Sequence, residues 1–142
     1  MELREVMTSK VEVIRPDAPI REAAKKMKDR DIGPLPVCDG ERIVGMLTDR
    51  DIVVNAVAEG RDPATTKVAD VMTPEVTYAF EDQDTEEAMR LMERYQLRRL
   101  PVLNREKRLV GIVSLGDLAR KEDETRTGET LREVSQPPGS HH

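Results

Sequence analysis

The two halves of the chain repeat one another, and this duplication constrains the fold more than any other feature of the sequence. At an offset of 65, residues 6–37 align with residues 71–102, sharing Val-Met-Thr near their starts and Leu-Pro-Val at their ends. One extra residue in the second half then moves the offset to 66, where Gly45 aligns with Gly111 and Asp51 with Asp117. A fixed period of this length is typical of a repeated supersecondary unit.

Hydropathy predicts the same order of elements in each half: strand, helix, strand, strand, helix. The predicted strands are residues 11–14, 35–38 and 42–47, and in the second half residues 76–79, 100–103 and 108–113. The first helix of each half has apolar residues at helical spacing: Ile20, Ala23, Ala24 and Met27, then Ala88, Leu91, Met92 and Tyr95. The second helices are expected at residues 49–59, ended by Gly60, and at residues 115–121. The fold class is therefore α+β, with two β-α-β-β-α units.

The length of each unit predicts how the units assemble. A unit of about 60 residues buries a smaller share of its surface than a larger domain and is marginal alone, so we expect the two to pack on each other about a pseudo-twofold axis. We expect repeat 1 at residues 3–60, a linker at 61–70 and repeat 2 at 71–121. Residues 122–138 are polar enough for a loose tail, with one short helical turn at Leu131 and Val134. Residues 139–142 resemble the remainder of a purification tag.

Composition excludes several classes of function. The only histidines, His141 and His142, lie in the tag-like end, and Cys38 is the only cysteine. A Ser-His-Asp or Cys-His nucleophile and a zinc site of His and Cys ligands are therefore unavailable within one subunit, and we expect neither an enzyme nor a metal or required cofactor. With three aromatic residues and a net charge of -5, nucleic-acid binding is a weak alternative, despite the basic residues between 98 and 108.

The sequence also predicts where the protein resides. No apolar run approaches the roughly 20 residues of a membrane span, and the first residues lack the apolar core of a secretory signal. A single cysteine fits a reducing compartment. We therefore expect a cytoplasmic protein with no membrane association.

The duplicated motifs resemble a known family. Over about residues 3–120, the segments LPV…VGMLTDRD and LPV…VGIVSLGD, each preceded by a Val-Met-Thr start, resemble a pair of CBS domains, also called a Bateman module. They are most similar to bacterial CBS pairs of the hypoxic-response type, in which the module is the whole protein. The resemblance implies clefts between the repeats for an adenosine-containing ligand such as AMP, ADP, ATP, S-adenosylmethionine or NAD. It also implies a homodimer, and sensing in place of catalysis.

The segment after each Val-Gly strand has two open interpretations. Thr48 with Asp51, and Ser114 with Asp117, have the spacing of a helix capping box. The same groups suit a nucleotide, because a helix start offers N–H groups and an aspartate accepts two hydrogen bonds from a vicinal diol. On the family pattern, Asp51 and Asp117 bind ribose, while Thr48 and Ser114 bind the sugar or its phosphate.

The remaining candidates are walls for adenine and cations for phosphate. The candidate wall residues are Val11, Val13 and Met46 in one cleft and Val76, Tyr78 and Ile112 in the other. For each of them, packing in the core is the alternative role. Arg98 and Arg99 precede the second Leu-Pro-Val, where the first half has Gly33-Pro34, and the family pattern turns such residues toward phosphates. An ordinary solvated surface is their alternative.

These candidates predict one better cleft and two possible functions. The cleft of Arg98, Arg99, Ser114 and Asp117 is expected to be the better nucleotide site, with the other empty or degenerate. Which repeat's strand faces which aspartate stays open at this point. The first hypothesis is a regulatory sensor that acts through a homodimer or an unidentified partner protein. The alternative is a dimeric scaffold with vestigial clefts and no ligand.

Overall fold

The first half of the chain consists of two helices packed on a two-stranded sheet. The computed structural model describes residues 1–133, and side chains as far as residue 124. Helix α1 (Ile20–Arg30) is followed by the antiparallel strands β1 (Leu35–Asp39) and β2 (Arg42–Leu47), with Leu35 opposite Leu47. Helix α2 (Asp49–Ile52) continues as a π-helix over Val53–Val57, and the chain turns at Gly60 with a positive φ. The expected helix over 49–59 is confirmed in its position.

The second half repeats these elements. Strand β3 (Ala79–Phe80) is parallel to β4 (Arg99–Leu103), which is antiparallel to β5 (Leu109–Ser114). Helix α3 (Thr85–Tyr95) ends at Gln96 in the left-handed conformation, as α1 ends at Asp31. Both hairpins carry a register shift at the same place, between Val37 and Cys38 and between Val102 and Leu103. The expected α+β fold of two related units is confirmed.

Two expected elements differ in extent. Of the strand expected at 11–14, only Ile14 pairs, with Val37, and the carbonyl of Val13 instead accepts a hydrogen bond from Lys26 Nζ at 2.7 Å. Of the strand expected at 76–79, only Ala79 lies in a strand, β3, which continues to Phe80. These segments lack regular pairing because the chain there runs from one sheet to the other, and its residues on the way have no strand beside them.

Helix α4 (Leu115–Glu133) is longer than the helix expected at 115–121, so a loose tail from residue 122 is wrong as far as Glu133. Its charged residues are good helix formers, and pairs such as Lys121 and Glu124, 3.8 Å apart, support successive turns. Leu131 falls inside this helix, and Val134 and the tag-like end lie outside the described residues.

The start of each repeat packs into the other half of the molecule. Leu3, in the short 3-10 helix Leu3–Glu5, is fully buried in the core of the second half, and its N–H donates to the Gln83 carbonyl at 2.9 Å. Val68, in the equivalent helix Val68–Asp70, is buried in the first core and donates to the Ala18 carbonyl at 2.8 Å. Leu3 thus belongs to the first repeat in sequence but packs in the core of the second half, and Val68, expected in the linker, is part of the first core.

This exchange explains the glycine in each Val-Gly strand. Thr73 pairs with Met46 of β2, and Thr8 pairs with Ile112 of β5, through two backbone hydrogen bonds each. A Cβ at Gly45 would lie 2.6 Å from the Met72 sulfur and 2.9 Å from the Thr73 carbonyl oxygen, and Gly111 is crowded in the same way by residues 7 and 8. Glycine is needed because the crossing segment lies directly on the strand.

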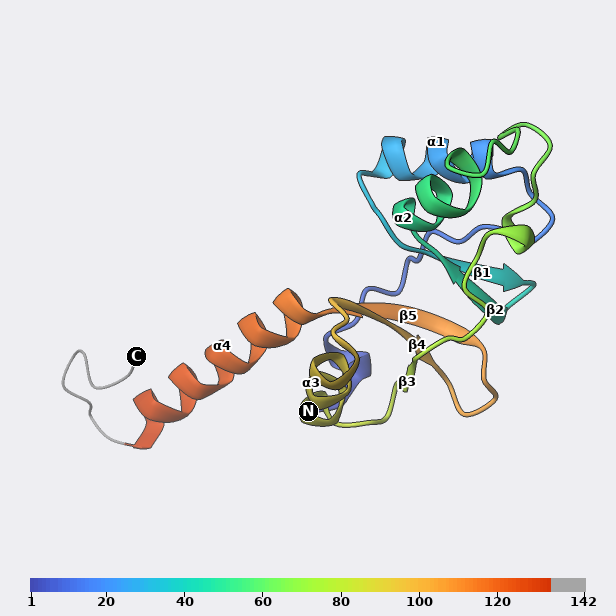
Figure 1. Cartoon of the computed structure of the whole chain (residues 1–142). Coiled ribbons are helices and arrows are strands. Elements are labelled where there is room, and N and C mark those ends of the chain that lie inside the picture. Colours follow the sequence, from blue (N-terminus) through green and yellow to red (C-terminus); the bar gives the residue numbers. More distant parts are fainter. Residues whose placement is uncertain (134–142) are drawn as a thin grey trace.

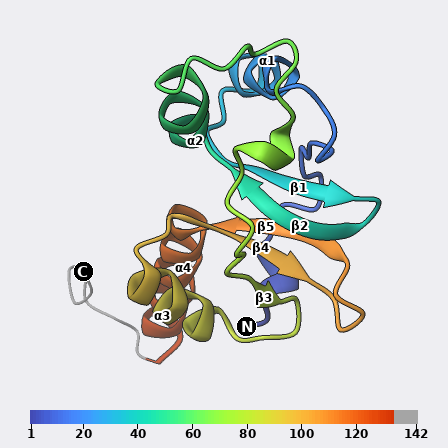
Figure 2. The ribbon, with the colours of Figure 1, turned by 45° about the vertical axis from the view of Figure 1, so that its right-hand side comes forward.

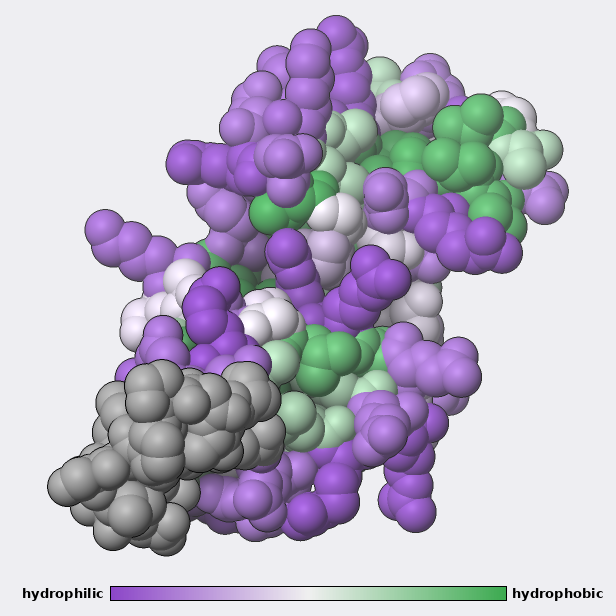
Figure 3. Space-filling model, turned by 90° about the vertical axis from the view of Figure 1, so that its left-hand side faces the viewer, coloured by the Kyte–Doolittle hydropathy of each residue, from purple (hydrophilic) through white to green (hydrophobic). Residues whose placement is uncertain are grey.

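The two sheets lie at the centre of the molecule, with the helices outside them (Figures 1 and 2). The equivalent contacts of the two exchanged segments fit the expected pseudo-twofold arrangement. Hydrophilic side chains cover most of the face in Figure 3, with hydrophobic ones in a few small areas. Among the described helices, none is both long and apolar enough to cross a bilayer, and the cytoplasmic location stays a prediction.

Candidate functional site

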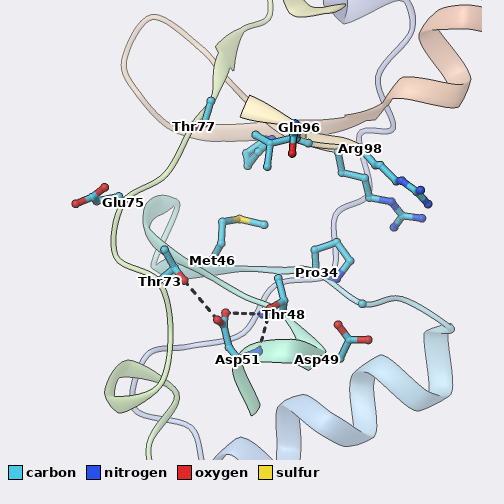
Figure 4. Close-up of a pocket in the computed structure, with 14 residues that line it drawn as sticks. Pro34, Met46, Thr48, Asp49, Asp51, Thr73, Glu75, Thr77, Gln96 and Arg98 are labelled. Atoms are coloured by element: carbon cyan, nitrogen blue, oxygen red, sulfur yellow. Dashed lines mark hydrogen bonds between the residues drawn. The ribbon is translucent and has the colours of Figure 1, made fainter. Parts of the chain in front are cut away.

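A cleft of about 470 Å³ opens between the two halves beside Asp51, and we call it the Asp51 cleft. Figure 4 shows its residues, which come from β2 and α2 on one side and from the segments before β3 and β4 on the other. Its lining consists of Gly33, Pro34, Met46, Thr48, Asp49, Asp51, Thr73, Glu75, Thr77, Gln96, Leu97, Arg98, Arg99 and Pro101. The cleft exists because Thr73 crosses β2 and the chain then enters the second half.

Asp51 forms the expected capping box and also faces the cleft. Its N–H donates to Thr48 Oγ1 at 3.1 Å, and its Oδ2 accepts from the Thr48 N–H at 2.9 Å. The other oxygen, Oδ1, accepts a long hydrogen bond of 3.5 Å from the Thr73 hydroxyl (Figure 4). Oδ2 therefore forms the hydrogen bond of the cap, whereas Oδ1 forms only a long, weak hydrogen bond that a ligand hydroxyl could replace.

Two arginines lie at the rim opposite Asp51. Arg98 and Arg99 line the Asp51 cleft, both are exposed, and within the described part of the chain neither guanidinium has an ion-pair partner. A guanidinium is a strong donor to phosphate or carboxylate oxygens. The cleft thus brings a carboxylate of the first repeat together with two cations of the second.

The equivalent cleft on the other side, the Asp117 cleft, measures about 370 Å³. It is lined by Thr8, Lys10, Val11, Glu12, Ile32, Pro34, Pro36, Arg99, Ile112, Val113, Ser114 and Asp117. Ser114 Oγ accepts from the Asp117 N–H at 3.0 Å, which is the expected cap, but the Asp117 carboxylate pairs with Arg120 one turn along α4. The carboxylate that should bind ribose here already has a cationic partner.

The structure corrects the expected grouping of the candidate residues. Arg98 lies in the Asp51 cleft and not with Ser114 and Asp117, whereas Arg99 contacts both clefts because it pairs with Ser114 across β4 and β5. The grouping was wrong because each repeat's T-x-x-D segment meets the other repeat's strand start. Each cleft is lined by two cations without an ion pair among the described residues: Arg98 and Arg99 in the Asp51 cleft, and Lys10 and Arg99 in the Asp117 cleft. The clefts differ in their carboxylates, because Asp117 pairs with Arg120 whereas Asp51 pairs with no cation in the described part of the chain.

The expected adenine walls are also exchanged between the clefts. Met46 was expected with Val11 and Val13 but shares its cleft with residues of the 73–77 segment, and Ile112 was expected with Val76 and Tyr78 but shares its cleft with residues of the 8–12 segment. Val11 lines the Asp117 cleft, but Val13, Val76 and Tyr78 line neither cleft. Tyr78 instead packs edge-on against Phe80, with ring centroids 5.5 Å apart.

Sequence reasoning missed several cleft residues, among them Thr73, Thr77 and Gln96. Thr73 could have been found, because it matches Thr8 in the duplicated Val-Met-Thr. Core packing gives no reason to repeat a threonine hydroxyl at this position. Gln96 follows the end of α3 in the left-handed conformation, which turns the chain into the cleft rim. No pattern in the sequence marks that position.

Comparison with known proteins agrees with this architecture. The CBS domain family model matches residues 3–57 and 68–124. The chain belongs to the CBS-domain family. The start of the second match at residue 68 agrees with the structural repeat, which begins with the buried Val68 and not at residue 71.

Similar proteins include members of the hypoxic-response type. Hypoxic response protein 1 of Mycobacterium tuberculosis is 36% identical over 135 residues, covering 94% of each chain. A crystal structure of Hypoxic Response Protein I with two coordinated zinc ions superimposes with a TM-score of 0.77 at 38% identity, over 85% of this chain and 98% of that one. The CBS domain pair of protein MJ0100, in complex with 5′-methylthioadenosine and S-adenosyl-L-methionine, gives a TM-score of 0.74 at 27% identity, over 86% and 99%.

The zinc of that structure prompts a test of fit for this CBS pair. Cys38 is buried in β1, where loss of solvation raises the pKa of its thiol to about 11, so it is protonated at neutral pH. Among the residues that the structure describes, no cluster of three or more His, Cys, Asp or Glu side chains could hold a metal ion. Zinc needs deprotonated nitrogen, sulfur or oxygen ligands in a close set, so the described residues do not fit a zinc site.

Proposed function

We propose that this CBS pair is a regulatory module that binds an adenosine-containing ligand in the Asp51 cleft. The observation that carries the proposal is one cleft of about 470 Å³ in which Asp51 from the first repeat faces Arg98 and Arg99 from the second. A cleft of this volume lies within the usual range for small-molecule sites. The complex of the MJ0100 CBS pair with 5′-methylthioadenosine and S-adenosyl-L-methionine supports this class of ligand.

Each side of the cleft has a role in this proposal. Asp51 Oδ1 accepts hydrogen bonds from the ribose hydroxyls, and replaces its long contact with Thr73. Met46, Leu97 and Pro34 supply apolar surface for adenine. Arg98 and Arg99 donate to a phosphate or a carboxylate of the ligand. These roles move the better site from Asp117, where it was expected, to Asp51.

The regulatory effect follows from the position of the cleft between the repeats. A ligand that contacts Asp51 and Arg98 joins the two halves, so it favours whichever conformation holds them at that separation. It can shift the population only by its difference in affinity for the two conformations. A micromolar ligand has about 8 kcal/mol of binding free energy, which leaves ample room for such a difference.

Thermal unfolding with AMP, 5′-methylthioadenosine, S-adenosylmethionine and NAD tests the proposal. A ligand that binds only the folded chain at a hundredfold excess over its Kd adds about 2.7 kcal/mol of stability, and the melting temperature rises. Asp51→Asn keeps an oxygen to accept from the Thr48 N–H but places an NH₂ group toward Thr73, so the ligand-induced rise should disappear. Asp117→Asn is the matched control and should keep it. Unchanged melting with every ligand would refute the proposal.

A specific observation also favours assembly into a homodimer, on which the alternative scaffold function depends. Val53, Val54 and Val57 lie on the helical segment after Asp51 and are 57%, 43% and 63% exposed. Exposed apolar side chains gathered on one segment are typical of an interface. Light scattering of the wild type and of Val57→Ser tests it, since a dimer through this segment should weaken with the substitution. A dimer that binds none of the adenosine ligands would favour the alternative function as a scaffold.

A further inference from the structure

Besides Asp51, the Asp51 cleft is lined by the carboxylates of Asp49 and Glu75, and that of Asp49 lies nearer the arginines (Figure 4). Asp49 is exposed and lines the cleft, and its carboxylate lies so close to Gly33 that a Cβ there would be 3.4 Å from Asp49 Oδ1. In Figure 4, Asp49 lies on the wall opposite Arg98, toward the same end of the cleft, with its carboxylate turned toward the space between them. Within the described residues, it forms no ion pair.

The fold does not need this carboxylate for capping. Thr48 and Asp51 already complete the capping box, and among the residues with described side chains the Asp49 carboxylate accepts only from the N–H of its neighbour Arg50, at 3.0 Å. The equivalent residue of the second repeat, at the offset of 66, is Leu115, which starts α4. The carboxylate is thus a property of the Asp51 cleft and not of the repeat.

We propose that Asp49 limits the charge of the ligand, so that the Asp51 cleft selects an adenosine ligand with no more than one phosphate. This inference rests on the proposed function. Arg98 and Arg99 attract a first phosphate, but each further phosphate extends the negative charge along the rim that Asp49 shares. The cleft therefore binds AMP, or a thioether nucleoside such as 5′-methylthioadenosine, better than ADP or ATP.

The expected size of the effect follows from Coulomb's law. At about 8 Å in water, two unit charges repel by roughly 0.5 kcal/mol, and ATP carries about two more negative charges than AMP, which amounts to about a fivefold difference in affinity. Salt reduces this difference, since the Debye length at 0.15 M is about 8 Å. A fivefold effect at low ionic strength should therefore shrink in 0.5 M salt.

The experiment is titration calorimetry of AMP and ATP into the full chain at low ionic strength, with EDTA to remove divalent cations. Asp49→Asn should raise the affinity for ATP about fivefold more than the affinity for AMP. Glu75→Gln is the matched control, because it removes the same charge from the same cleft while the Glu75 carboxylate points away from it in Figure 4. It should leave the ratio of the two affinities unchanged.

The outcomes separate this inference from the proposed function. Binding of AMP and ATP with equal affinity in the wild type, or an unchanged affinity ratio in Asp49→Asn, overturns the role of Asp49 and leaves the adenosine site standing. In that case Asp49 acts only on the stability of α2 as an acidic residue in its first turn, and the melting temperature of Asp49→Asn falls without any change in selectivity. Absence of binding by every adenosine compound overturns both.

Discussion

Gly45→Ala should destabilise the protein, although alanine normally suits an ordinary strand position better than glycine. The φ of Gly45 is not positive, so alanine reduces the entropy of the unfolded chain and would by itself stabilise by about 0.4–1 kcal/mol. The new methyl group, however, would lie 2.9 Å from the Thr73 carbonyl oxygen, which accepts from the Met46 N–H at 2.9 Å. A loss of unfolding free energy in Gly45→Ala would therefore show that Thr73 lies directly against β2, whereas a gain would show that it does not.

The magnitude follows from the groups that must move. Overpacking costs about 1–3 kcal/mol, and weakening the two Met46–Thr73 backbone hydrogen bonds adds about 1 kcal/mol. We expect a net loss of about 2–3 kcal/mol, a large share of the 5–15 kcal/mol typical of a domain. Urea unfolding followed by circular dichroism measures it, with the m-value unchanged.

Two further variants make the test specific. Gly116→Ala lies in α4 with no atom closer than 4.0 Å to the added Cβ, so it should be neutral or stabilise by up to about 1 kcal/mol. Adding Met72→Ala to Gly45→Ala removes the sulfur at 2.6 Å but not the carbonyl oxygen, so most of the loss should remain. A Gly45→Ala protein within about 0.5 kcal/mol of the wild type would refute the argument that the crossing segment requires glycine.

Two further predictions follow from shifted pKa values. Because burial raises the pKa of Cys38 to about 11, its thiol should not react with a disulfide reagent at pH 8 in the folded protein and should react rapidly in 8 M urea; rapid reaction without urea would show that β1 opens locally. Arg105 holds the pKa of Asp82 below its usual value through hydrogen bonds of 2.8 and 2.9 Å, so their contribution to stability is present above about pH 4 and is lost as the pH falls through the lowered pKa. The stability deficit of Asp82→Asn in urea unfolding should be present at pH 7 and should shrink as the pH falls below about 4; an equal deficit at all of these pH values would contradict this role.

The repeat, the family and nearly every hairpin and helix could be predicted from the sequence. Local signals suffice for these, because the apolar spacing of Ile20 to Met27 and the Leu-Pro-Val strands depend only on near neighbours. The capping box of Thr48 and Asp51 was also readable, because all of its atoms lie within four residues.

The residues that share a cleft could not be predicted in this way, because long-range packing brings them together. In a duplicated chain, Leu3 and Val68 have nearly the same neighbours in sequence, and each could pack in either half. The choice depends on contacts between distant segments, such as Leu3 with residue 83 and Thr73 with Met46, which hydropathy does not encode. That choice brings Arg98 of the second repeat to Asp51 of the first, whereas the pair of Asp117 with Arg120 lies within α4 and depends only on near neighbours.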